Sequence, residues 1–97
     1  MATIIRRKSD NVVTHYAQSA DFDSGYLIFI DVDGARTHSI DVTSDAYEII
    51  NDVVHPAKPW SLCFSYIDGT YTILTDVVDD INRIRSENNY PELEVEI

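Results

Sequence analysis

The sequence predicts an α+β fold, with a mostly antiparallel sheet of about five to six strands and two amphipathic helices packed on one face. Two apolar segments, 25–42 and 60–74, each contain a central Asp-Gly pair, which is the pattern of a β-hairpin. Two other segments, 43–54 and 75–89, repeat apolar residues with the period of a helix. Hairpins that alternate with helices are typical of an α+β domain.

Residues 1–97 are expected to form one domain, because a chain of 97 residues suits a single hydrophobic core. No apolar run approaches the roughly 18 residues of a membrane span. The first residues, where Arg6, Arg7 and Lys8 follow a short apolar patch, do not resemble a secretory signal. The only cysteine, Cys63, cannot form an internal disulfide, which favours a cytoplasmic location.

In the first hairpin, Asp33-Gly34 is predicted to form a two-residue turn. The register that follows pairs Asp31 with Arg36, Phe29 with His38 and Leu27 with Ile40. Strand 26–32 is apolar on both faces, which predicts a central place in the sheet. Before it, residues 11–18 are a strand candidate and 18–25 are the longest expected loop.

In the second hairpin, Asp68-Gly69 is predicted to form the turn. Large apolar residues alternate with small ones from Trp60 onward, so this strand should have one buried face. The predicted register pairs Tyr66 with Tyr71 and Phe64 with Ile73.

The segment 43–54 is predicted to be the first helix. Thr43-Ser44-Asp45 offers a capping side chain and an acid for the first turn, and Pro56 should end the helix at His55. The apolar residues that share one face of such a helix are Ala46, Ile49, Ile50, Val53 and Val54.

The second helix is predicted to begin at Thr75 or Asp76 and to end at Asn88-Asn89. Asp79 and Arg83 are one turn apart and should pair. The tail 92–97 alternates acidic and apolar residues, which predicts a final strand. Its core side should carry Leu93, Val95 and Ile97, and its wet side Glu92, Glu94 and Glu96.

The stretch Tyr26-Leu-Ile-Phe-Ile-Asp-Val-Asp-Gly-Ala35 resembles the first motif of the haloacid-dehalogenase-like phosphatases. The resemblance implies Asp31 as nucleophile, Asp33 as general acid/base, and Asp79-Asp80 as magnesium ligands. Ala35 stands where that family has Thr, and the family's doubly wound parallel sheet needs a longer chain. We therefore expect a hairpin rather than an enzyme.

Two other kinds of site are suggested only by fragments. Asp21–Gly25 and Asp31–Gly34 resemble parts of a calcium loop but lack its later ligands. Cys63 could combine with His15, His38 or His55 as a nucleophile and base. A single cysteine in a strand is more often a packed apolar residue. We expect no catalytic residue, no cofactor and no metal.

Charge is the most informative property of the composition. Seventeen acidic residues face seven basic ones, and the formal net charge is −10. Such a chain repels nucleic acids and anionic membranes, so its expected partner is a protein with a basic surface. The alternative is that the charge serves solubility alone. Rows of acids on predicted wet faces are the candidate contacts: Glu48 and Asp52 on the first helix, Asp76, Asp79, Asp80 and Glu87 on the second, and Glu92, Glu94 and Glu96 on the tail.

In size and charge the chain resembles the anti-CRISPR and anti-restriction proteins of bacteriophages, and also the immunity proteins that block nuclease toxins. This resemblance implies a small acidic inhibitor whose carboxylates imitate nucleic-acid phosphates on a nuclease or on a CRISPR or restriction complex. Trp60 is the candidate anchor, because tryptophan is frequent at interface hot spots. The alternative from another class is an assembly module that forms a homodimer through the edge of the C-terminal strand.

Overall fold

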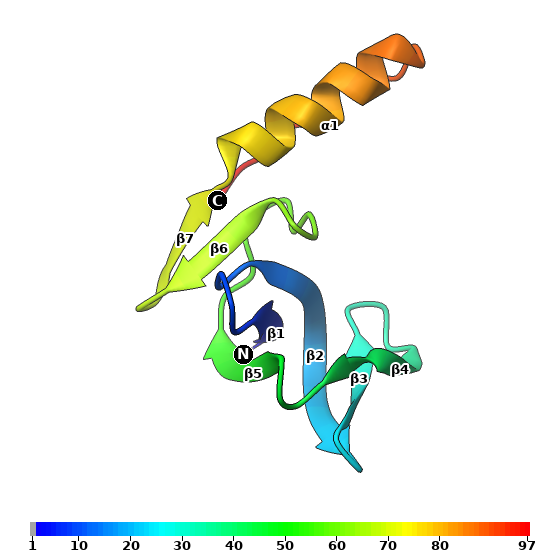
Figure 1. Cartoon of the computed structure of the whole chain (residues 1–97), viewed down its shortest axis with the longest axis vertical. Helices are drawn as coiled ribbons and strands as arrows, with labels where there is room; N and C mark the ends of the chain where they lie inside the picture. Colours follow the sequence, from blue (N-terminus) through cyan, green and yellow to red (C-terminus); the bar gives the residue numbers. More distant parts are fainter. Residues whose placement is uncertain (1) are drawn as a thin grey trace.

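The computed structural model describes residues 2–97 and consists mainly of β-strands (Figure 1). The elements are β1 (Ala2–Arg7), β2 (Val13–Asp23), β3 (Tyr26–Asp31), β4 (Arg36–Thr43), β5 (Tyr47–Val53), β6 (Phe64–Ile67), β7 (Thr70–Ile73) and α1 (Thr75–Glu87). Five strands form an antiparallel sheet in the order β4-β3-β2-β1-β5, and β6 pairs with β7 in a separate sheet. The predicted architecture, two helices on one face of a sheet, is therefore wrong.

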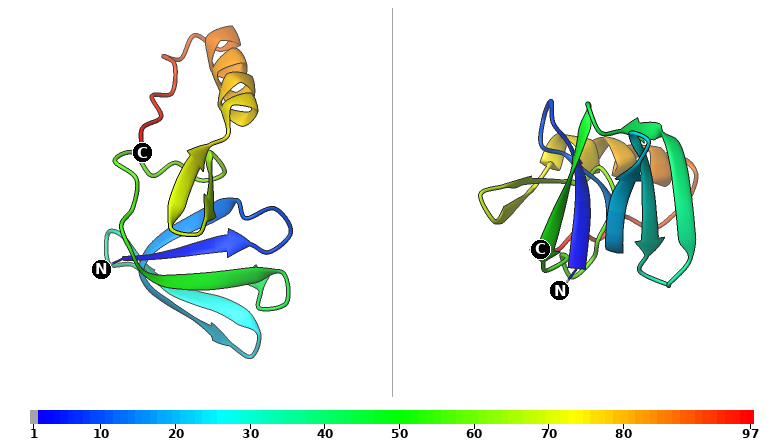
Figure 2. Two further views of the ribbon diagram at one scale, coloured as in Figure 1. Left: turned by 90° about the vertical axis from the view of Figure 1, so that its left-hand side faces the viewer. Right: turned by 90° about the horizontal axis from the view of Figure 1, so that it is seen from below.

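The five-stranded sheet is strongly curled (Figure 2). Its two edge strands, β4 and β5, are separated in the chain only by residues 44–46. In a flat sheet the two edge strands would lie about 19 Å apart, at four spacings of about 4.8 Å. The four Cα–Cα steps that connect β4 to β5 span at most about 15 Å. The short connection therefore requires the sheet to curl. The connecting turn also bonds to two other turns, because Ser44 N donates to Gly25 O and Lys8 N donates to Ala46 O, both at 2.9 Å.

Two hydrophobic cores lie on opposite faces of this sheet. The inner core contains Ile5, Ala17, Leu27 and Val42, and partly buried residues of β5 pack against it, so all five strands enclose it. The outer core contains Ile4, Val13, Tyr16, Val53, Cys63 and Phe64. The neighbours Ile4 and Ile5 enter different cores because successive side chains of a strand point to opposite faces. No sequence pattern predicted a strand at these residues.

The β6–β7 hairpin covers the outer core. Its first residue, Phe64, is fully buried. The hairpin is joined to the start of β2, because Leu62 N donates to Val13 O at 2.9 Å and Tyr66 N donates to Asn11 O at 3.0 Å. The predicted pairs, Phe64 with Ile73 and Tyr66 with Tyr71, are confirmed. The first strand of the hairpin begins at Phe64, however, and not at Trp60.

The segment predicted as the first helix is instead a turn followed by β5. Ile49 packs against the inner core and Ile50 against the outer core, so the segment is a strand buried on both faces. A bulge follows, because β1 pairs Ile4 with Ile50 and Ala2 with Val53. Asp52 takes up the extra residue with a left-handed φ of 59°. Because of the bulge, Val53 lies on the same face of the sheet as Ile50. The two apolar residues are three positions apart, which is the spacing expected of a helix.

The register predicted for the first hairpin is wrong by one residue. Arg36 pairs with Ile30 and His38 pairs with Ile28. The Asp31 carboxylate accepts hydrogen bonds from Asp33 N at 2.9 Å and from Ala35 N at 3.0 Å, which builds a longer turn than Asp33-Gly34 alone. In addition, most of the expected loop 18–25 belongs to β2, which continues to Asp23.

Helix α1 has the predicted limits. The tail that follows it does not form the predicted strand. Residues 92–97 run alongside the helix toward the β6–β7 hairpin without joining a sheet (Figure 2). Leu93 and Val95 pack against the outer core, as the alternation indicated, but Ile97 is 62% exposed. We call α1 and the tail, residues 75–97, the acidic arm. It extends from the hairpin to one end of the molecule (Figure 1).

Candidate functional site: an acidic arm and two surface hollows

Helix α1 carries all its carboxylates on one face. Residues three and four positions apart are neighbours on a helix, and the exposed acids of α1 follow this spacing: Asp76, Asp79, Asp80 and Glu87. The opposite face directs Val78 and Ile81 toward the outer core. From Asp76 to Glu87 the row extends about 16 Å along the helix axis, at a rise of about 1.5 Å per residue.

Arg83 neutralises the distal part of this row. Its guanidinium lies 3.8 Å from Asp80 and 3.5 Å from Glu87, whereas the predicted partner was Asp79. Exposed pairs of this kind are weak and exchange readily with water or with another ion. Among residues 2–97, no ion pair engages Asp76 or Asp79. The strongest negative charge of the helix is therefore in its first two turns.

The tail is held in place by backbone contacts. The indole Nε1 of Trp60 donates to Glu94 O at 2.9 Å, and Leu93 N donates to Asn82 Oδ1 at 2.7 Å. The side chain of Arg85 donates to Pro91 O at 2.7 Å. Trp60, the predicted partner anchor, thus has a structural contact within the chain, although 43% of it remains exposed.

In the described residues 2–97, one carboxylate of the tail has a cationic partner. Lys58 pairs with Glu94, and their side-chain hydrogen bond raises the pKa of Lys58 and lowers the pKa of Glu94. The other two, Glu92 and Glu96, are exposed and form no ion pair within the described residues. The acidic arm as a whole has seven carboxylates and two arginines.

The last two predicted contact residues do not lie on a helix. Glu48, on β5, is paired with Arg6 of β1. Asp52 lies at the bulge near the other end of β5 and is exposed. The structure therefore separates Glu48 and Asp52 from each other, and it brings neither into the carboxylate row of α1.

The basic cluster near the N-terminus is bound to the body of the protein. Arg6 donates to Tyr66 O as well as to Glu48. Arg7 pairs with Asp10 at 2.8 Å. The side-chain hydrogen bond from Arg7 is the main cause that lowers the pKa of Asp10. Lys8 donates to Ser44 O at 3.0 Å. All three cations therefore hold turns and strands together.

A groove of about 580 Å³ lies where β5 ends, next to the acidic arm. Its walls are residues 52–57, the hairpin residues Tyr66, Gly69 and Tyr71, and Ile97 of the tail. The Tyr71 hydroxyl donates to Val54 O at 2.8 Å and so joins the two walls. Burial, and secondarily the neighbouring Tyr66, raises the pKa of Tyr71 to about 12. No pattern in the sequence indicates this groove, because its three segments are far apart in the chain.

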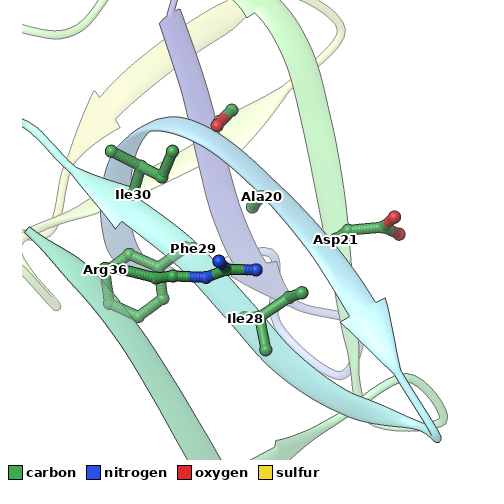
Figure 3. A pocket seen from close by; sticks show the side chains of 7 residues that line it. Ala20, Asp21, Ile28, Phe29, Ile30 and Arg36 are labelled. Carbon is green, nitrogen blue, oxygen red and sulfur yellow. The ribbon is translucent and has the colours of Figure 1, made fainter. Parts of the chain in front are cut away.

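A second hollow, of about 280 Å³, lies over β2, β3 and β4 (Figure 3). Ile28, Phe29 and Ile30 form part of its lining, and the side chain of Arg36 extends from β4 across β3 (Figure 3). Of the lysines and arginines in residues 2–97, only Arg36 has no side-chain hydrogen bond or ion pair. Asp21 is also at this hollow but points away from Arg36.

The residues that resembled catalytic fragments lie in a turn and in the outer core. Asp31 caps its own turn, and Asp33 is exposed at the tip of that hairpin. Cys63 is buried in the outer core, and desolvation raises the pKa of its thiol, which opposes thiolate chemistry. Within the part of the chain that is described, no three His, Cys, Asp or Glu side chains are arranged to bind a metal.

No family model matches the chain, and the comparisons with curated proteins and with solved structures gave no match either. In residues 2–97, no helix is both long enough and apolar enough to cross a membrane.

Proposed function

We propose that this chain is a non-catalytic inhibitor that binds a basic, nucleic-acid-handling protein through its acidic arm. The observation that carries the proposal is the unbalanced charge of an element that extends away from the sheet (Figure 1). Four carboxylates of the arm form no ion pair in the described chain: Asp76, Asp79, Glu92 and Glu96. An acidic and accessible surface is what a basic groove would bind.

Inhibition would follow from competition. Carboxylates spaced along a helix and a tail take the place of phosphates on the partner, and nucleic acid is then excluded from the same surface. Complementary charge speeds the encounter and makes the complex sensitive to salt. By resemblance in size and charge, the partner would be a nuclease toxin or a CRISPR or restriction complex, and binding would take place in the cytoplasm.

The test is a pull-down from a bacterial lysate with the tagged chain, followed by mass spectrometry. We expect a nuclease or another nucleic-acid-binding complex that is released by high salt and by added DNA. A variant with Asp76→Lys and Asp79→Lys should lose this partner and keep its fold.

A matched control has the same change of charge on the opposite part of the molecule. Asp33→Lys with Asp41→Lys changes two exposed acids of the β3–β4 hairpin that form no side-chain hydrogen bond or ion pair in the described residues. This variant should retain the partner. Equal capture by both variants would show that the arm is not the binding surface.

A second candidate function, assembly of a homodimer, is favoured by the hollow over β3. The predicted contact through a C-terminal strand edge does not exist, because the tail forms no strand. The outward side of β3 instead presents Tyr26 and Ile30 to solvent at 42% and 38% exposure. A two-fold contact on this face would place Asp21 of one copy near Arg36 of the other, which satisfies the unpaired arginine.

A further inference from the structure

The groove at the end of β5 has the composition of a site for a cation with an apolar stem. Its volume of about 580 Å³ falls within the usual range of ligand sites, about 300–1,000 Å³. Two of the exposed side chains at its margin are apolar: Val54 is 73% exposed and Ile97 is 62% exposed. When another apolar group covers exposed apolar side chains beside a preformed hollow, binding is favoured because apolar surface is removed from water.

Two aromatic rings contact each other at this groove in a tilted arrangement. The centroids of Tyr66 and Tyr71 lie 4.7 Å apart at an interplanar angle of 58°. The hydrogen bond from the Tyr71 hydroxyl to Val54 O fixes the ring against the loop. A guanidinium group binds the face of an aromatic ring by cation–π attraction and by stacking of two planar groups.

The only carboxylate side chain that lines the groove is Asp52, and no cation of residues 2–97 pairs with it. Arg6, which reaches Tyr66 O, is held by Glu48 and does not line the groove. The backbone of Asp52 is in the left-handed region at φ 59°. The bulge therefore places an acid without an ion pair in the described residues at the groove that Tyr66 and Tyr71 also line.

The groove also continues into the acidic arm. Ile97 forms part of its wall, and the adjoining Glu96 is exposed and without an ion pair in the described chain. A basic segment of a partner that follows the tail would therefore arrive at the groove. The net charge of −10 attracts cations to the whole molecule.

We infer that this groove binds an arginine side chain of the partner, with the guanidinium between Asp52 and the rings of Tyr66 and Tyr71. The aliphatic part of that arginine covers Val54 and Ile97. This inference rests on the proposed function, since it names the anchor of the same basic partner. The proposed anchor for the partner is therefore this groove and not Trp60, whose side chain holds the tail.

The experiment uses the full chain labelled with ¹⁵N and needs no partner. The probe is N-acetyl-arginine N-methylamide, and the matched neutral probe is N-acetyl-citrulline N-methylamide, which has nearly the same shape without the charge. We expect arginine to shift the amide resonances of residues 52–57, 66–71 and 97, with an affinity about two- to fivefold higher than that of citrulline.

Asp52→Asn is the decisive variant, because asparagine also accepts a left-handed φ and only the charge is lost. It should lower the arginine affinity toward that of citrulline, because the rings of Tyr66 and Tyr71 remain, and Asp33→Asn, with the same change of charge at a distant turn, should leave it unchanged. Tyr66→Phe should retain binding and Tyr66→Leu should weaken it, provided that both variants keep the wild-type pattern of amide resonances outside the hairpin.

Equal shifts from both probes would overturn the inference, as would shifts confined to α1 or full binding by Asp52→Asn. The two proposals fail separately. A pull-down without a nucleic-acid-handling partner, combined with arginine binding in the groove, rejects only the inhibitor. A salt- and DNA-sensitive partner, combined with no response to arginine, rejects only the groove.

Discussion

The indole nitrogen of Trp60 donates a hydrogen bond of 2.9 Å to the backbone carbonyl of Glu94 and thereby joins the loop before β6 to the returning tail. The neighbouring Lys58 pairs with the side chain of the same residue. Since α1 has no fully buried residue, the position of the acidic arm depends on a few contacts of this kind.

Trp60→Phe should release the tail. The substitution keeps an aromatic ring and removes one hydrogen bond, so we expect a loss of about 1 kcal/mol in the free energy of unfolding. Hydrogen exchange of the Leu93 amide, which is bonded to Asn82, should accelerate more than exchange in β1. Tyr90→Phe is the control, because the Tyr90 hydroxyl makes no hydrogen bond in the described residues. Unchanged exchange at Leu93 in Trp60→Phe would contradict this role.

Asp31→Ala should destabilise the first hairpin, because Asp31 is expected to stabilise a turn and not to act as a nucleophile. The carboxylate accepts two backbone hydrogen bonds, and because both are exposed, so that water can replace the carboxylate, their loss should cost about 0.5–1.5 kcal/mol. Asp33→Ala should change stability by no more than about 0.5 kcal/mol, since its side chain is exposed and forms no hydrogen bond within residues 2–97. Urea denaturation of both variants is the measurement, and equal losses would show that the Asp31 contacts do not form the turn.

The same aspartate explains why the register could not be predicted from the sequence. Asp33-Gly34 is a strong indicator of a two-residue turn, but the Asp31 side chain supplies hydrogen bonds that favour a longer loop. In the second hairpin no such side chain competes. Asp68 and Gly69 both have positive φ, as a tight turn requires, and the predicted register is correct.

The error at 43–54 has a different cause. A pattern of apolar residues at i, i+3 and i+4 describes a helix with one buried face. It also describes a strand that is buried on both faces and contains a bulge, as β5 is around Asp52. Only the contact with β1 and the two cores distinguishes these structures, and that information is not local. The limits of α1 were predicted more successfully, because the spacing of its apolar and acidic residues is local information.

The stability of the protein should fall between pH 10 and pH 12 partly because of Tyr71. Its pKa is about 12 in the folded protein against an ordinary value of 10.0, so the unfolded chain loses this proton first. The stabilising contribution is complete below pH 10 and disappears as the pH rises through 12. Tyr71→Phe should be less stable at pH 8, since it lacks the bond to Val54, but its stability should decline less steeply above pH 10. Parallel pH profiles in urea denaturation would contradict the assignment.

The assembly candidate makes a prediction that depends on Asp21 and Arg36 together. In a two-fold dimer through the outward face of β3, each aspartate would meet the arginine of the other copy. Asp21→Arg alone and Arg36→Asp alone should each place like charges together and yield monomers in sedimentation at high protein concentration. The double variant exchanges the two charges, restores both contacts and should dimerise like the wild-type chain. Ile30→Lys removes an apolar contact of the same face and should abolish dimers in either background. A wild-type chain that stays monomeric at all concentrations would reject assembly through β3 and leave the inhibitor as the function to test.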